Sequence, residues 1–143
     1  MAARSADEQN ELSRERFAPR AHGYRESALH ASGSDLEWLV EALAARPGEA
    51  VLDVATGGGH VALALARTGA DVTACDLTPE MLDAAGMLLA EHGCEARFVV
   101  AEAAALPFDD ARFAVVTCRI AAHHFPDAAA FFADAARVLR PGG

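Results

Sequence analysis

The stretch Val51-Leu52-Asp53-Val54-Ala55-Thr56-Gly57-Gly58-Gly59-His60 decides the fold of this chain. An apolar run that contains one carboxylate passes into a glycine-rich turn, and residues 61–67 then have a helical composition. This order predicts a buried strand, a tight turn and a helix that starts at the end of the strand. Backbone N–H groups and a helix N-terminus in that position can hold the polar end of a nucleotide-like ligand. We expect Asp53, the acid inside the strand, to decide which ligand binds.

The composition is typical of one globular domain. The chain has 143 residues, of which 52% are hydrophobic, and a chain of this size can bury a real core. No apolar run reaches the roughly 20 residues of a membrane helix, so we expect no membrane insertion. The net charge of −9 disfavours nucleic acid as a partner. Cys75, Cys94 and Cys118 show no metal-ligand spacing, so we expect no metal and interpret them as buried thiols in a reducing cytoplasm.

Strand-like and helix-like segments alternate along the chain after residue 34. Helical segments of roughly 10–15 residues between short apolar runs predict right-handed βαβ units and a parallel sheet. We therefore predict a doubly wound α/β fold with a mostly parallel, open sheet. The expected strands are 50–54, 71–75, 96–101 and 113–118, and the expected helices are 35–45, 59–68, 78–92 and 127–139.

Local patterns add three expectations about the helices and the N-terminus. Ser34 and Glu37 have the spacing of a capping box, which predicts that Ser34 caps the helix that follows it. The apolar spacing in the last helix predicts an inward face made of Phe131, Phe132, Ala135 and Val138. Residues 1–16 are charged and aperiodic, and we expect their start to fray.

Polar or glycine-rich positions follow directly after each predicted strand. They are the loop 55–59, Asp76, Glu102 with Ala103, and Arg119 with Ile120. The carboxyl ends of parallel strands share one edge, where open α/β sheets bind ligands, so we expect these positions to form one site. Asp76 could accept from both hydroxyls of a ribose, each bond being worth about 1.5–3 kcal/mol. The alternative for Asp76 is a turn or helix-capping acid.

The loop alone does not separate two classes of ligand. Gly57-x-Gly59-x-x-Ala62 followed by Asp76 also satisfies the fingerprint of an NAD-type dinucleotide-binding domain. A pyrophosphate against this turn would lie roughly 5 Å from Asp53, at a cost of about 3 kcal/mol for an effective dielectric near 20. A ligand with an ammonium group, a sulfonium and a ribose would instead gain from Asp53, Asp76 and Glu102. S-adenosylmethionine has these groups.

Four segments in order and in register resemble one known family. They are VLDVATGGGHVALALA (51–66), VTACDLTPEML (72–82), AEAAALPFDDARFAVVTC (101–118), and HHFPD (123–127) with RVLRPGG (137–143). The chain resembles a class I S-adenosylmethionine-dependent methyltransferase of the small-molecule type, similar to the ubiquinone and menaquinone biosynthesis C-methyltransferases. The resemblance covers nearly everything from residue 50 onward. It implies S-adenosylmethionine as cofactor and a small-molecule methyl acceptor as partner.

The resemblance implies that the first loop holds the methionine end of the cofactor, mostly through backbone groups of Asp53, Ala55, Thr56 and Gly57. Gly59 is expected to permit a close approach where the helix starts. Many relatives have glycine in place of Ala55, which fits here if Ala55 keeps a negative φ.

The other strand ends are expected to hold the rest of the cofactor. By resemblance, Asp76 binds the ribose diol, Leu77 and Met81 line the adenine, Glu102 accepts from the adenine amino group, and the Ala103 N–H meets a ring nitrogen. Glu102 stands where aspartate is usual and reaches one methylene further. Arg119 and Ile120 are expected to contact the cofactor. Tyr24, in the N-terminal segment, is a further candidate, with an ordinary surface aromatic as the alternative.

His123 and His124 are the candidate catalytic residues. They follow the fourth strand at the cofactor edge and titrate near neutrality, as a general base for methyl transfer requires. The alternative is that this pair only structures its loop.

The family implies the strand order 3-2-1-4, with strands 5–7 absent from this chain. We therefore expect a C-terminally truncated core over residues 35–143, preceded by a partly flexible segment, 1–34, that covers the cofactor site. An uncovered fourth strand favours self-association through its edge. The leading hypothesis is methyl transfer to a small molecule. The alternatives are a module that binds S-adenosylmethionine without turnover, and the dinucleotide-binding domain.

Overall fold

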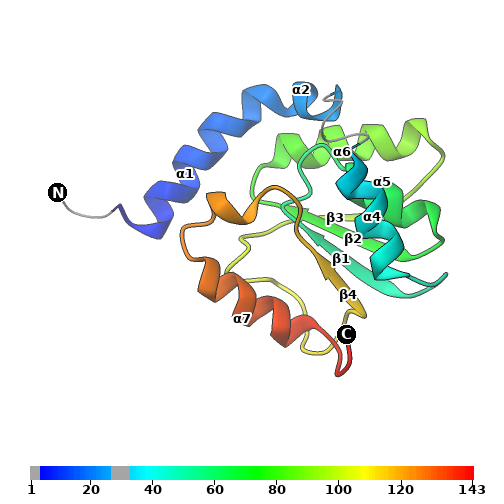
Figure 1. Cartoon of the computed structure of the whole chain (residues 1–143). Coiled ribbons are helices and arrows are strands. Elements are labelled where there is room, and N and C mark those ends of the chain that lie inside the picture. Colours follow the sequence, from blue (N-terminus) through cyan, green and yellow to red (C-terminus); the bar gives the residue numbers. More distant parts are fainter. Residues whose placement is uncertain (1–3, 27–32) are drawn as a thin grey trace.

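The fold is built on a four-stranded parallel sheet. The computed structural model describes residues 4–26 and 33–143. The strands are β1 (Ala50–Val54), β2 (Asp71–Asp76), β3 (Arg97–Val100) and β4 (Val115–Thr117). Their order is β3-β2-β1-β4 with every pairing parallel, which confirms the predicted order (Figure 1). β4 lies at one edge of the sheet, and its pairing with another chain stays a prediction.

Helices pack on both faces of this sheet, as a doubly wound fold requires. α4 (Ser34–Leu43), α5 (His60–Arg67) and α6 (Pro79–Glu91) cover one face, and α7 (Ala128–Val138) covers the other (Figure 1). Before them come α1 (Ala6–Phe17), a short 3-10 helix η1 (Ala18–Arg20) and α2 (Ala21–Glu26). A second short 3-10 helix, η2 (Ala122–His124), follows β4. No helix within the described residues is long and apolar enough to cross a membrane.

Side chains along β1 point alternately to the two faces of the sheet and belong to the hydrophobic core on each face. Val51 packs with the residues under α4, α5 and α6, whereas Leu52 and Val54 pack with those under α7. Side chains of a strand point to opposite faces in turn, and a parallel sheet covered on both sides buries both sets. β1 therefore lies in the middle of the fold, and its carboxyl end is held by two packed layers.

The charged N-terminal stretch is a helix. Ser5 accepts a hydrogen bond from the Glu8 N–H, and the Glu8 carboxylate accepts from the Ser5 N–H, so a complete capping box begins α1. Such a box satisfies two of the N–H groups that the first turn leaves open. The helix is stabilised at its start although it has no apolar stripe.

Two helix expectations are wrong. Ser34 does not cap α4, because the cap position is Gly33 and no side chain bonds there. Phe132 is not on the inward face of α7: it is 63% exposed, while Phe131 is 4% exposed. Phe131, Ala135 and Val138 are spaced i, i+4, i+7 and fill the inward stripe. Phe132 directly follows Phe131 and is therefore turned by about 100° around the helix axis, away from this stripe.

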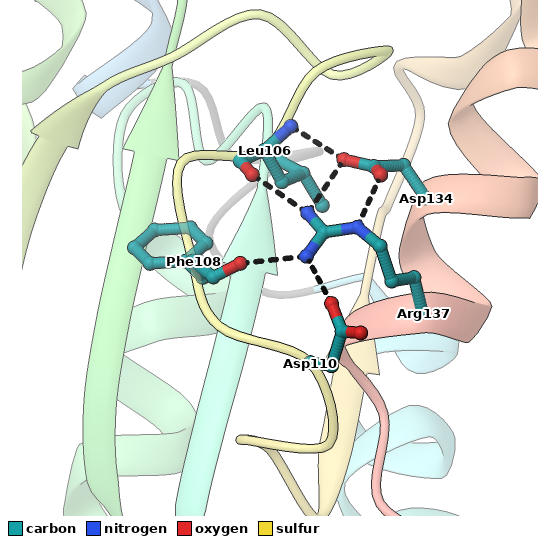
Figure 2. Close-up of polar contacts among 5 residues, drawn as sticks. All are labelled: Leu106, Phe108, Asp110, Asp134 and Arg137. Carbon is teal, nitrogen blue, oxygen red and sulfur yellow. Dashed lines mark hydrogen bonds and ion pairs between the residues drawn. The ribbon is translucent and has the colours of Figure 1, made fainter.

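Arg137 fastens the loop before β4 to α7. Its guanidinium donates to the Leu106 carbonyl at 2.8 Å and the Phe108 carbonyl at 2.7 Å (Figure 2). It also pairs with Asp134 at 2.7 Å and Asp110 at 2.8 Å, and Asp134 in turn accepts from the Leu106 N–H. One planar cation thus satisfies backbone groups of a loop that has no regular structure.

We expect Arg137→Ala to lower the melting temperature by several degrees, because two loop carbonyls and two carboxylates lose their donor. Arg137→Lys should recover only part of the loss, since an ammonium cannot reproduce the fork of bonds. Arg140→Ala, a change at an exposed arginine of the same segment, is the matched control. Thermal unfolding followed by circular dichroism measures all three. Equal melting temperatures for the alanine variants would show that the contacts of Arg137 add no stability.

Candidate functional site

A cavity opens where the loops after all four strands meet. Its walls come from the carboxyl end of β1 and the loops after β2, β3 and β4, and α1 closes one side. The predicted positions brought together there are Asp53, Ala55, Thr56, Gly57, Asp76, Leu77, Met81, Glu102, Ala103, Arg119, Ile120 and His124. Neither Gly59 nor His123 lines the cavity. The side chain of Tyr24 lies outside the described residues, although its backbone belongs to α2.

The loop after β1 adopts a left-handed conformation at a residue where we expected none. Ala55 has φ 54°, so the expectation that it keeps a negative φ is wrong. The N–H of the next residue, Thr56, donates to the Cys75 carbonyl at 3.0 Å, which ties the loop to β2. A residue other than glycine in this region costs on the order of 1–3 kcal/mol, and such strain is concentrated at functional sites.

Gly59 permits a close approach between two helices. It has φ 87°, and a Cβ placed on it would lie 2.6 Å from the Cβ of Ala85 in α6. A side chain there would push α5 away from α6. Because Gly59 does not line the cavity, its demonstrable contact in this structure is helix packing.

Asp53 is a buried carboxylate held between two hydroxyls. It is 1% exposed, and its two oxygens accept from Thr56 Oγ1 and Thr117 Oγ1, each at 2.7 Å. Burial raises the pKa of Asp53 to about 6, against the lowering effect of the two hydroxyls. The charge of Asp76 raises this pKa further and that of Arg119 lowers it. The site thus holds a negative charge that is poorly solvated.

Asp76 organises the loops as well as facing the cavity. Its carboxylate accepts from the Gly57 N–H and the Thr78 N–H, both at 2.9 Å. Burial raises the pKa of Asp76, although these N–H groups favour its ionised form. These bonds make Asp76 a turn acid, as the alternative to a ribose-binding role predicts. A carboxylate has about four acceptor positions, so two bonds leave capacity for a ligand.

Arg119 brings a cation to the same cavity. Its guanidinium forms two bonds to Asp35 of α4, from Nε at 2.6 Å and from Nη2 at 2.9 Å. The Arg119 side chain is only 8% exposed, and its bond to Asp35 lowers the pKa of that carboxyl. No local pattern predicted Asp35 as its partner, because the two residues lie 84 positions apart.

α1 supplies cavity residues that the sequence reasoning missed. Asn10 Nδ2 donates to Glu102 Oε1 at 2.8 Å, and Ser13 and Phe17 also line the cavity. The Phe17 ring packs edge-on against His124 with 5.1 Å between ring centroids. His60, the first residue of α5, is a further lining residue that we had not singled out. No periodic pattern in α1 marked these positions, because nearly every residue of the helix is polar.

The two candidate catalytic histidines pack against each other with their rings tilted by 43°, but only one of them faces the cavity. Their ring centroids are 3.9 Å apart, and only His124 lines the cavity. Burial, and then the charges of His123 and Arg16, lower the pKa of His124. His124 is therefore neutral at pH 7, which is the form that can accept a proton.

The cysteines and acids indicate no other chemistry. Burial raises the pKa of Cys75 and of Cys118 to about 12, so neither thiol ionises at neutral pH. Among the residues that the structure describes, no three histidine, cysteine or acidic side chains are grouped as a metal site. The site is thus a cavity with buried carboxylates on one side, which favours a ligand that carries positive charge and hydrogen-bond donors.

Known proteins resemble this chain over most of its length. A family described as a methyltransferase domain matches residues 51–143. The uncharacterized methyltransferase YcgJ of Bacillus subtilis is 38% identical over 128 residues, which make up 89% of this chain and 51% of YcgJ. The crystal structure of YcgJ superposes with a TM-score of 0.72 at 37% identity, over 76% of this chain and 47% of that one.

Two further relatives carry more specific names. Demethylmenaquinone methyltransferase of Thermus thermophilus is 38% identical over 116 residues, 78% of this chain and 53% of the relative. A SAM-dependent methyltransferase from Geobacter sulfurreducens, solved in complex with S-adenosyl-L-homocysteine, is 30% identical with a TM-score of 0.71. That match covers 87% of this chain and 53% of the other. The chain spans about half the length of the relatives it matches.

The burial of Asp53 leads to a pH prediction. Because its folded pKa lies above its unfolded value, the folded state binds the proton more tightly, and the contribution of Asp53 to stability falls as the pH rises from about 4 to 6. We expect Asp53→Asn to be more stable than the wild type above pH 6, by on the order of 2–3 kcal/mol, and to lose this advantage near pH 4.

Denaturant unfolding of both proteins between pH 4 and 8 measures the difference in free energy. Asp109→Asn, which changes an exposed carboxylate, is the control and should show no such trend. If the difference in unfolding free energy between Asp53→Asn and the wild type does not vary with pH, Asp53 has the same pKa in the folded and unfolded states.

Proposed function

The chain belongs to the methyltransferase domain family, and on that premise we propose that it binds S-adenosylmethionine in this cavity and transfers a methyl group to a small molecule. The observation that carries the proposal is the convergence of Asp53, Asp76 and Glu102 on one cavity at the carboxyl edge of the sheet. Two of these carboxylates have raised pKa values because they are buried. A cationic ligand would relieve the cost of that burial.

The donor and acceptor chemistry of the cavity fits this cofactor. S-adenosylmethionine carries an ammonium group, a sulfonium, a ribose diol and an adenine amine, which are all cations or hydrogen-bond donors. The cavity presents carboxylate acceptors from three strand ends. A dinucleotide would instead place its pyrophosphate close to Asp53, which is 1% exposed and poorly screened by water. The NAD-type alternative is therefore disfavoured.

We assign the methionine end to the loop after β1. Its backbone is fixed by the bonds of Thr56 to Asp53 and to Cys75, and by the bond of Gly57 to Asp76. Asp53 is the acceptor that favours an ammonium group nearby. Ala55, Gly57 and Arg119 complete this part of the cavity.

We assign the nucleoside end to the loops after β2 and β3. Asp76 keeps acceptor capacity for a ribose diol while two backbone N–H groups hold it in place. Leu77 and Met81 supply apolar walls for the adenine, and Glu102 and Ala103 lie at its polar edge. Ile120, which lines the cavity in the loop after β4 and has φ 56°, is assigned to contact with the cofactor.

Methyl transfer asks the protein mainly for alignment and exclusion of water. S-adenosylmethionine supplies an activated methyl group for in-line displacement by a nucleophile. Positioning of the two reactants contributes roughly 7–11 kcal/mol in favourable cases. His124, neutral and at the cavity wall, is the candidate to take a proton from an acidic acceptor, and the His123 ring packs against it at a tilt. A cofactor-binding module without turnover is the second candidate, because the chain spans half of its relatives.

Calorimetric titration of the chain with S-adenosylhomocysteine and with NADH tests the ligand class. We expect binding of the first and not of the second. Asp76→Asn should weaken S-adenosylhomocysteine binding by about 1.5–3 kcal/mol, roughly ten- to over a hundred-fold, because a charged acceptor of the ribose is lost. Asp71→Asn, at the other end of the same strand and exposed, should bind as the wild type does. Preference for NADH would overturn the proposed cofactor.

Activity with a labelled methyl donor and a panel of quinones, phenols and amines tests turnover. If His124 is the general base, His124→Gln lowers kcat by roughly 10²–10⁴-fold with little change in cofactor affinity. The wild-type rate should fall as the pH drops through the lowered pKa of His124, since only the neutral ring accepts a proton. His92→Gln, at the residue that follows α6, is the control. Cofactor binding without activity on any acceptor would favour the binding module. Equal kcat values for the wild type and His124→Gln would show that the two histidines only structure their loop.

A further inference from the structure

α1 is attached to three of the loops that form the cavity. Asn10 bonds to Glu102 after β3, Arg14 Nε donates to the Leu77 carbonyl after β2 at 3.3 Å, and Phe17 packs on His124 after β4. These three residues lie on one side of α1 at positions i, i+4 and i+7. One face of this polar helix therefore contacts the loops at the rim of the cavity.

Asn10 is the member of this face that is buried. It is 7% exposed, on a helix whose other described residues are exposed or half-buried. A buried amide must be hydrogen-bonded to be tolerated, and its partner is Glu102 Oε1 at 2.8 Å. Within the described residues Glu102 Oε2 accepts no bond, so one oxygen of this carboxylate is held and the other is available.

We propose that Asn10 is a positioning residue, which holds the Glu102 carboxylate so that its second oxygen accepts from the exocyclic amine of adenine. The inference rests on the proposed function and goes beyond it by making recognition of the base depend on α1. A glutamate side chain has three torsions and, when free, spreads its oxygens over many positions. The bond from Asn10 removes much of that freedom before a ligand arrives, which is preorganisation in the ordinary sense.

This role makes a prediction that a plain cover over the cavity does not make. If α1 only shields the cavity, loss of the Asn10 amide weakens every adenosyl ligand equally. If Asn10 orients Glu102, its loss weakens only ligands whose base carries the amine. A matched pair of ligands therefore separates the two roles: S-adenosylhomocysteine, and its analogue in which hydrogen replaces the 6-amino group of the purine.

The experiment is calorimetric titration of the wild type, Asn10→Ala and Asn10→Asp with both ligands. The wild type should prefer S-adenosylhomocysteine by about tenfold or more, as a hydrogen bond to a charged group implies. Asn10→Ala should lose most of this preference, through weaker binding of S-adenosylhomocysteine and unchanged binding of the analogue. Asn10→Asp keeps the shape of the side chain but sets a second carboxylate against Glu102, so it should lose the preference as well. Melting curves confirm that each variant is folded.

Gln9→Ala is the matched control, because it removes a carboxamide from the neighbouring position of α1 whose partner is the Arg4 carbonyl. It should keep the preference of the wild type. An unchanged preference in Asn10→Ala, or an equal loss for both ligands, would overturn the inference while leaving the proposed function intact. A wild-type chain that binds neither ligand would overturn the proposed function, and this inference with it.

Discussion

A carboxylate buried between two hydroxyls is the constraint on which the site depends. Asp53 belongs to the central strand, Thr56 to the loop after it and Thr117 to β4, so their two hydrogen bonds join three segments at the floor of the cavity. The arrangement fixes the loop that carries Ala55 and Gly57. It also leaves a negative charge that water cannot reach, which raises the pKa of Asp53 to about 6. Burial of the charge costs stability, and a cation bound beside it would relieve part of that cost.

The rest of the cavity also combines carboxylates with the groups that hydrogen-bond to them and with one arginine. Asp76 and Glu102 add carboxylates from the next two strand ends, and backbone N–H groups or an amide hold each of them. Arg119 is the cation within this acidic group, and Asp35 binds it from α4. Two of the helices that precede the sheet thus contact residues of the site, α1 through Asn10 and α4 through Asp35. α1 is therefore part of the cavity wall.

A separate set of contacts, made by Arg137, holds the face of the sheet that α7 covers. Arg137 binds the loop over Leu106 and Phe108 to α7, and that loop leads directly into β4 (Figure 2). Because Thr117 belongs to β4 and bonds to Asp53, the position of this strand matters to the site. The arginine and the buried carboxylate lie in different layers, yet both fix the same strand.

The sequence by itself predicted the four strands and the four helices that follow residue 33, but neither α1 nor α2. A short apolar run that passes through a glycine-rich turn into a helical segment is a local signal, and β1 and α5 follow it. The alternation of strands and helices predicts parallel pairing, and the family resemblance implies the strand order. The capping box at Ser5 was equally readable, although the aperiodic charge of the segment hid it. Tertiary structure decided what depends on distant neighbours: the left-handed Ala55, the pairing of Asp35 with Arg119, and the bond of Asn10 to Glu102 across 92 positions. Such contacts form only when packing brings the two segments together, so no local pattern can encode them.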